Sequence, residues 1–146
     1  MKSKIIFLDI DGVLNTDQDF EFYYVNPKNL EVLVQIVKET SAEIVLISTW
    51  KFIPEAMVHL TSTFDKAGLS IVDVTFDRYD DRAEGIKKWL SERKDIENYV
   101  ILDDELFDYE ETGISSKLVH IDSNLGLTLG RFSEILSILN NEKFVN

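Results

Sequence analysis

The stretch Lys4-Ile5-Ile6-Phe7-Leu8-Asp9-Ile10-Asp11-Gly12-Val13-Leu14-Asn15 decides the fold of this chain. A run of β-forming residues ends at Asp9, and Asp11 and a turn at Gly12 follow it. This order places two carboxylates at the carboxyl end of a buried strand, which is where open α/β sheets bind their ligands. Two acids at such a place predict a cation or a reaction that uses them.

The rest of the chain alternates between strand patterns and helix patterns. Further strands are expected at 42–47, 70–75, 99–102 and 117–121, after the first at 4–9. Helices are expected from Pro27, from Pro54, over 81–93 and over 129–139, with Asp81 and Glu84 resembling a capping box. We therefore predict an α/β fold, a doubly wound parallel five-stranded sheet with helices on both faces. No repeat or linker interrupts residues 1–146, which predicts a single domain.

Composition limits the classes of function. The chain has 146 residues and a formal net charge of −12, which disfavours nucleic acid and anionic membranes as partners without excluding nucleic acid. It contains no cysteine, so thiolate metal sites and a cysteine nucleophile are excluded and a cytoplasmic location is favoured. No apolar run reaches membrane-spanning length, and the N-terminus does not resemble a secretory signal. Oligomeric state cannot be predicted from this sequence.

Polar residues follow three of the predicted strands. The first strand supplies Asp9 and Asp11, the second supplies Ser48, and the fourth supplies Asp103 and Asp104. The carboxyl ends of parallel strands meet in one crevice, so these side chains are expected to lie close together. Carboxylates at that spacing repel one another unless a cation binds them, and a set of oxygen ligands suits Mg²⁺.

This arrangement fits phosphoryl transfer, which depends on in-line positioning and on neutralising charge at the phosphoryl oxygens. Asp9 is the expected nucleophile and Asp11 the expected general acid and base. Ser48 and the backbone amides around Gly12 are expected to donate hydrogen bonds to the phosphoryl oxygens.

The same residues resemble the motifs of the haloacid dehalogenase superfamily, in the usual order. Asp9-Ile10-Asp11-Gly12 resembles the first motif, and the resemblance implies that the Asp11 carbonyl also binds the metal. Ile47-Ser48-Thr49-Trp50 resembles the second motif and implies phosphate binding by Ser48 and Thr49. Val100-Ile101-Leu102-Asp103-Asp104 resembles the acidic fourth motif. The resemblance spans residues 4–129, and it implies a Mg²⁺-dependent phosphatase with an aspartyl-phosphate intermediate.

The third motif of that superfamily is a basic residue, and this chain offers several. Arg82 is preferred, because a cation in the first turn of a helix opposes the helix dipole and needs a nearby acid or anion to stabilise it. Lys51 ranks second and Lys87 third. Ser-Thr-Trp-Lys at 48–51, together with the segments 82–90 and 101–105, further resembles a branch that includes domains fused to RNA-repair proteins.

The sequence leaves too little room for a cap domain. An open crevice implies a bulky phosphorylated substrate or closure by a partner subunit, with 16–25 as a flap. The aromatic residues of this flap would either face the substrate or pack on the core: Phe20, Phe22, Tyr23 and Tyr24. Trp50 and Trp89 are expected to pack in the core or at its rim. Asp108 is expected to be a solvated acid rather than an outer ligand of the metal.

Three alternatives to this Mg²⁺-dependent phosphatase stay open. A non-enzymatic phosphate or metal-binding domain would keep the acids without turnover. A two-component receiver would place its acid pair after the first strand, whereas here the adjacent pair follows the fourth. A phosphatase for polynucleotide ends would share the mechanism and differ only in its substrate.

Overall fold

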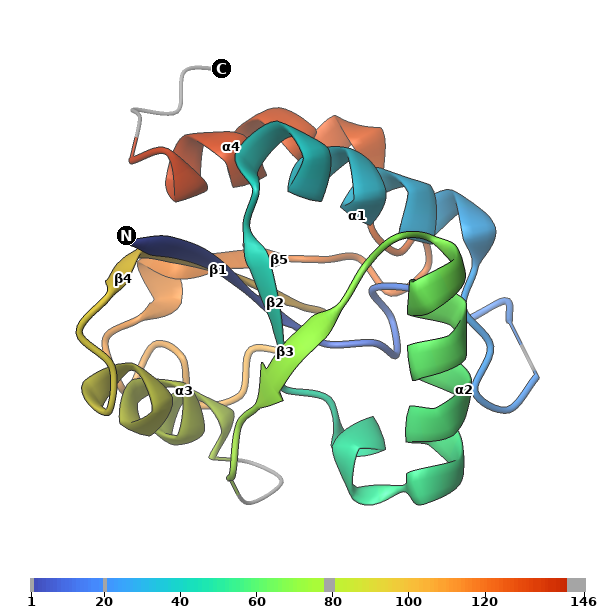
Figure 1. Cartoon of the computed structure of the whole chain (residues 1–146), viewed down its shortest axis with the longest axis horizontal. Coiled ribbons are helices and arrows are strands. Elements are labelled where there is room, and N and C mark those ends of the chain that lie inside the picture. The colour runs from blue at the N-terminus through green and yellow to red at the C-terminus, as the bar shows by residue number, and fades with distance from the viewer. Residues whose placement is uncertain (1, 20, 78–80, 142–146) are drawn as a thin grey trace.

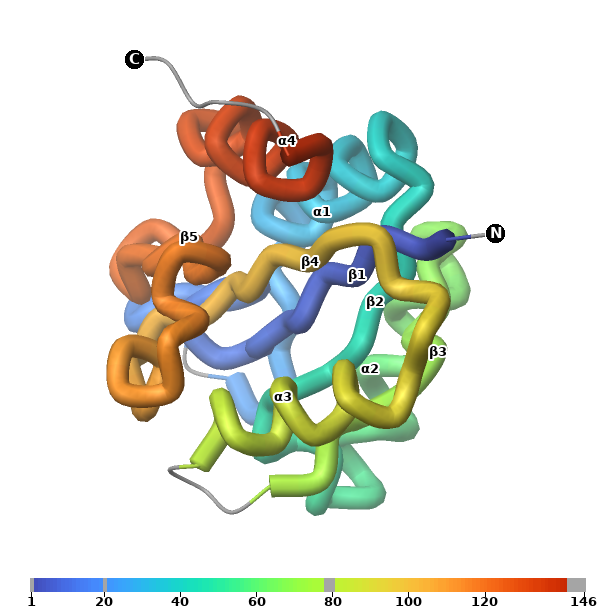
Figure 2. Tube along the Cα trace, turned by 90° about the vertical axis from the view of Figure 1, so that its left-hand side faces the viewer, coloured from blue at the N-terminus to red at the C-terminus, as the bar shows by residue number. Residues whose placement is uncertain are grey.

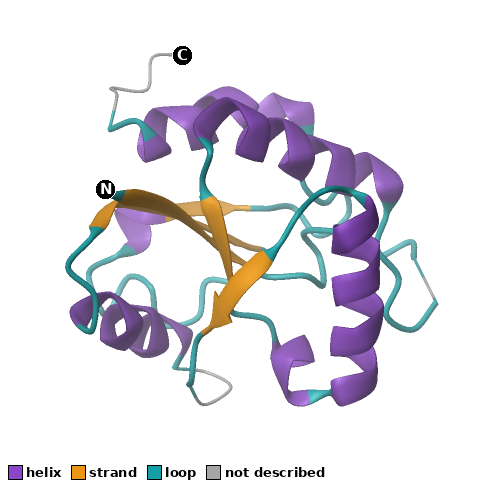
Figure 3. Cartoon of the chain, viewed as in Figure 1, coloured by secondary structure: helices purple, strands orange, loops and turns teal. Residues whose placement is uncertain are grey.

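The computed structural model describes residues 2–19, 21–77 and 81–141. Five parallel strands form one sheet in the order β3-β2-β1-β4-β5 (Figures 1 and 3). The strands are β1 (Ser3–Leu8), β2 (Glu43–Leu46), β3 (Ile71–Val74), β4 (Ile96–Asp103) and β5 (Leu118–His120). The helices between and after them are α1 (Pro27–Thr40), α2 (Pro54–Lys66), α3 (Arg82–Ser91) and α4 (Phe132–Leu139), with short 3₁₀ turns at Thr49–Phe52, Ser115–Lys117 and Leu129–Arg131.

Side-chain alternation along β1 sets the two layers of the core. Ile6 and Leu8 pack with buried residues of α1, α2 and α4 on one face of the sheet. Ile5 and Phe7 pack on the other face with α3 and with the segment after β4. Figure 2 shows α1 and α4 on one side of β1 and β4, and α3 on the opposite side. Because both faces are covered, β1 is apolar and buried from Ile5 to Leu8, as expected for a central parallel strand.

The predicted class of fold is confirmed: a parallel five-stranded sheet with helices on both faces. Each predicted strand is present, although β4 begins at Ile96 rather than at Tyr99. The helices from Pro27 and Pro54 begin at those prolines, and Asn26 caps the first by accepting a hydrogen bond from Lys28 N at 2.9 Å. Within the described residues, no cap domain is inserted into the fold.

The predicted capping box at α3 is wrong. Asp81 occupies the N-cap position, but its side chain makes no capping hydrogen bond. The acceptor is Asp108, which lies after β4 and is far away in the sequence.

The flap consists of turns without strands where it is described, and Phe20 lies outside the described residues. Its ends are tied together, because Asn26 N donates to Leu14 O at 2.7 Å. Among the described residues, no helix has the length and apolar character needed to cross a bilayer.

Candidate active site

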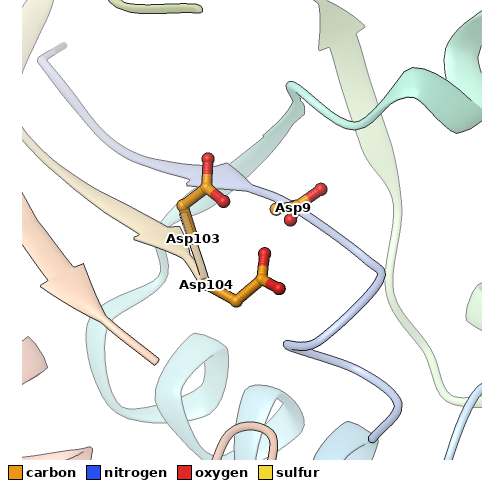
Figure 4. Close-up of side chains that lie close together, drawn as sticks. All are labelled: Asp9, Asp103 and Asp104. Carbon is orange, nitrogen blue, oxygen red and sulfur yellow. The ribbon is translucent and has the colours of Figure 1, made fainter. Parts of the chain in front are cut away.

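The ends of two neighbouring strands, β1 and β4, bring three carboxylates together. Asp9 follows β1, Asp103 ends β4, and Asp104 comes directly after it (Figure 4). Paired backbones hold this geometry, since Asp9 N donates to Leu102 O at 2.9 Å. A carboxylate oxygen from each of the three residues lies within 4.8 Å of the others. Two positions separated by more than ninety residues in sequence thus share one small volume, as the sheet topology predicts.

Arg82 lies against two of these acids. Its Nη1 is 3.1 Å from Asp9 Oδ1 and 2.9 Å from Asp103 Oδ2. Its guanidinium carbon stands 4.4 Å from the centre of the Phe107 ring, which shields one side of the ion pair. Tyr109 Oη donates to Asp103 Oδ2 at 2.6 Å, so Asp103 is fully buried but well bonded. The preferred third-motif residue therefore lies where a cation is needed to offset the acids.

The electrostatics of the cluster favour a bound cation. Burial raises the pKa of Asp9 well above its usual value, Asp103 adds to this shift, and Arg82 opposes it. Burial, together with the charge of Asp103, raises the pKa of Asp104 to about 6. Burial alone would lower the pKa of Arg82, but Asp9 and Asp103 raise it overall. One arginine does not neutralise three carboxylates, which leaves negative charge directed at the crevice.

Gly12 allows the turn after β1 to approach the end of β4. Its φ of 81° lies in the left-handed region, which glycine adopts without a steric penalty. A Cβ at this position would overlap the Asp104 carboxylate. The glycine therefore fits both the turn and the close approach of Asp104. The sequence motif predicted the turn but not the approach of Asp104.

Asp11 is exposed, and two side chains fix its orientation. Trp50 Nε1 donates to Asp11 Oδ2 at 3.0 Å, and Asn15 Nδ2 donates to Asp11 Oδ1, also at 3.0 Å. Asn15 also accepts a hydrogen bond from Gly12 N at 2.9 Å, so one residue joins the turn to the carboxylate. Sequence reasoning missed both contacts, since Trp50 was expected only to pack.

Ser48 and Thr49 follow β2 at the same edge of the sheet. Ser48 is buried, and its Oγ accepts a hydrogen bond from Trp50 N at 3.1 Å, which caps the short 3₁₀ turn. Its hydroxyl proton is free to point at another acceptor. Thr49 is the first residue of that turn and is partly exposed.

The two other candidate cations are bonded to groups outside the acid cluster. Lys51 Nζ forms an ion pair with Asp77 and donates to Thr75 Oγ1 at 3.1 Å. Burial lowers the pKa of Lys51, and Asp77 counteracts that shift. Lys87 is exposed and donates to Thr112 O at 3.3 Å. Of the three candidates, Arg82 is the one in contact with the acid cluster.

Asp108 anchors the helix that carries Arg82, and the expectation that it is solvated was wrong. Its carboxylate accepts hydrogen bonds from Ala83 N at 2.8 Å and from Glu84 N at 3.3 Å, and only 9% of the residue is exposed. An acid at the N-terminus of a helix stabilises both the free amides and the dipole. No local pattern could reveal this contact, because the cap comes from a different segment of the chain.

The donor set fits a hard divalent cation. The three residues offer carboxylate oxygens, which are the ligands that Mg²⁺ prefers, and no cysteine is present anywhere in the chain. A bound cation would also favour the ionised form of Asp9, against the effect of burial.

Residues 5–132 match the family model described as the HAD domain in Swiss Army Knife RNA repair proteins. The match covers most of the 146 residues, and the chain belongs to this family of haloacid dehalogenase (HAD) domains. A comparison with curated proteins gives no significant match.

Proposed function

We propose that this protein is a Mg²⁺-dependent phosphatase that hydrolyses phosphomonoesters through an aspartyl-phosphate on Asp9. The observation that carries the proposal is the meeting of Asp9 with Asp103 and Asp104 within 4.8 Å, with Arg82 bonded to two of them. A buried acid cluster without a use would cost stability, because its charges repel one another. Membership of the HAD family supports the same chemistry.

The reaction has two steps in this proposal. An Asp9 oxygen attacks the phosphorus in line, the bond to the leaving oxygen breaks, and Asp11 gives that oxygen a proton. Asp11 then takes a proton from water, which attacks the phosphorus and releases inorganic phosphate from Asp9. Trp50 and Asn15 hold the Asp11 carboxylate in one orientation for both transfers.

The oxygens of the phosphoryl group need donors on several sides. Ser48 and Thr49 lie on the segment that follows β2, and they fit this role, whereas the amide of Gly12 already donates to Asn15 Oδ1. Arg82 stabilises the negative charge on the side of Asp9 and Asp103. Lys51 contributes positive charge at a greater distance, since its ammonium group is bound to Asp77.

Mg²⁺ would be held by Asp9, Asp103 and Asp104, with the Asp11 carbonyl as a further ligand. When bound, it would neutralise charge on the phosphoryl oxygens and keep the Asp9 carboxylate ionised.

A phosphorylated nucleic-acid end is the substrate class that the family favours, because its description refers to RNA-repair proteins. The described fold has no cap domain above the strand ends, which suits a bulky substrate. The net charge of −12 opposes broad contact with a polyanion and favours recognition of an end rather than of a long strand.

Hydrolysis of an aryl phosphate and of a phosphorylated oligonucleotide, with Mg²⁺ or with EDTA, tests the proposal. We expect turnover that requires the metal and is lost in Asp9→Asn, while Asp17→Asn, an exposed acid of the flap, keeps it. Failure of both substrates with Mg²⁺, or full activity of Asp9→Asn, would refute the proposed phosphatase. Binding of Mg²⁺ without any turnover would instead favour a non-enzymatic binding domain.

A further inference from the structure

A pocket lies between the flap and α2. Its volume is about 690 Å³, within the range of small-molecule sites. Its lining residues are Phe22, Tyr23, Glu55, Val58, His59 and Ser62. Figure 1 shows the flap beside α2, at the right of the view. None of the residues assigned above to the acid cluster or to phosphate binding lines this pocket.

Two flap aromatics form one corner of the pocket. Phe22 is 91% exposed, and its ring centre is 6.1 Å from that of Tyr23, with the two planes tilted by 48°. A nearly uncovered aromatic ring beside a pocket gains apolar contact when a flat group binds against it. The corner thus suits a planar aromatic ligand.

The backbone of Tyr23 is held in an unfavourable conformation. Its φ of 57° lies in the left-handed region, which bulky residues rarely adopt unless neighbouring contacts enforce it. Two such contacts are present. The Tyr23 ring meets the Trp50 ring edge to face at 5.7 Å, and Asn15 Nδ2 donates to Tyr24 O at 3.0 Å.

These contacts link the pocket to the proposed general acid. Trp50 and Asn15, which fix the flap, are also the two residues that bind the Asp11 carboxylate. Asp11 protonates the leaving oxygen in the proposed mechanism, so the leaving group must lie on its side of the crevice. The path from Asp11 through Trp50 and Tyr23 leads to the Phe22 corner.

We propose that this pocket binds an unpaired nucleobase of the leaving group, next to the phosphate that is removed. The inference rests on the proposed function and specifies the part of the substrate that the protein recognises. A base has an uncharged planar face, and stacking on an aromatic side chain requires that the base be unpaired.

The charged groups considered at the site and in the pocket favour a base over further phosphates. Lys51 is paired with Asp77, and Arg82 is paired with Asp9 and Asp103. The pocket itself carries the carboxylate of Glu55. Recognition of the substrate is therefore expected to depend on stacking more than on contacts with the backbone of the strand.

Two trinucleotides with a terminal phosphate test this proposal. Each is prepared in two forms, one with the phosphate at the 5′ end and one with it at the 3′ end, and the form that is hydrolysed faster defines the preferred end. One carries uridine at the phosphorylated terminus and the other carries an abasic ribose, so the leaving alcohol is the same. We expect kcat/KM of the wild type to be about tenfold higher for the uridine substrate at the preferred end, which is a typical value for one stacked base. Phe22→Ala should reduce this ratio to about one.

Phe76→Ala is the matched control. Phe76 is 76% exposed and follows β3, but it does not line the pocket, so its removal should keep the ratio. Equal kcat/KM for both substrates in the wild type, or an unchanged ratio in Phe22→Ala, overturns the base pocket while Asp9-dependent turnover still supports the phosphatase.

Absence of turnover would refute the phosphatase instead, and binding then tests the pocket. The two trinucleotides would be titrated into the wild type and into Phe22→Ala by calorimetry. A preference for uridine that Phe22→Ala removes supports the pocket. Equal affinity, or no binding of either, overturns it.

Discussion

Trp50 donates its indole N–H to Asp11, with 3.0 Å between Nε1 and Oδ2. The other tryptophan also donates its indole N–H to an aspartate, away from the acid cluster: Trp89 Nε1 donates to Asp73 Oδ2 at 2.8 Å. Both indoles are mostly buried, at 3% and 7% exposure, so the two bonds form a natural comparison. One of them orients the proposed acid and base, and the other joins α3 to β3.

Trp50→Phe should lower kcat because it removes a hydrogen bond that fixes Asp11. A hydrogen bond of ordinary strength corresponds to a loss of about fivefold. Trp89→Phe removes an equivalent bond to Asp73 and should leave kcat unchanged. Steady-state kinetics on an aryl phosphate compares the two variants, and equal losses in both would show that the Trp50 bond has no special role.

Arg82→Gln should strongly destabilise the metal-free protein. It leaves Asp9 and Asp103 buried without a cationic partner, which typically costs about 3 kcal/mol of unfolding free energy. Arg93→Gln breaks a more exposed ion pair with Asp73 and should cost about 1 kcal/mol. Urea unfolding followed by circular dichroism measures both.

Arg82→Lys retains the positive charge and should fall between these two variants in stability. If Arg82→Gln lowers the free energy of unfolding no more than Arg93→Gln does, Arg82 does not stabilise the buried acids.

Mg²⁺ should raise the melting temperature of the wild type. At one hundred times the dissociation constant, a ligand of the folded state adds about 2.7 kcal/mol, or roughly 5 °C or more. Asp104→Asn removes one repelling carboxylate and one ligand. We expect it to be more stable than the wild type without metal and to respond little to Mg²⁺.

Glu105→Gln is the matched control for Asp104→Asn. Glu105 is exposed, and its backbone N–H, which donates to Asp103 Oδ1 at 3.1 Å, is retained in the variant. It should keep the full response to Mg²⁺. Thermal unfolding with EDTA and with Mg²⁺ checks all three proteins, and an undiminished Mg²⁺ response in Asp104→Asn would remove Asp104 from the metal site.

Asp108→Ala should weaken both the fold and the site, because the start of α3 loses its cap. Loss of a helix cap usually costs about 1–2 kcal/mol. Glu84→Ala changes an exposed acid in the same turn and should cost less. Since Arg82 is the first residue of α3, we also expect a larger loss of kcat in Asp108→Ala. Chemical unfolding and kinetics on the same preparations separate the two effects.

The sequence predicts the sheet and the acid cluster because both depend on local patterns. Apolar strands followed by Asp9 and by Asp103-Asp104 need only the rule that parallel strands share a carboxyl edge. Arg82 could be preferred for a similar reason. A cation that opposes its own helix dipole indicates an acid nearby, and the structure places Asp9 and Asp103 there.

The missed features depend on contacts between distant segments. Asp108 caps a helix from twenty-five residues away, and Trp50 reaches Asp11 across thirty-nine. Neither spacing follows a helical or strand period, so no pattern in the sequence predicts them. The ion pair between Lys51 and Asp77 could not be predicted either, because the two residues follow different strands.

The bond from Asn26 N to Leu14 O closes the flap at its base, like the stem of a hairpin. Just above this stem, Tyr23 contacts Trp50 and Tyr24 O accepts a hydrogen bond from Asn15, so this part of the flap is joined to Asp11. Doubling the length of such a loop adds only about 0.6 kcal/mol to the entropy cost of closing it. Residues 16–22 are therefore an insertion point, where longer or different segments can change the choice of substrate while Tyr23 and Tyr24 keep their contacts with the residues that hold Asp11.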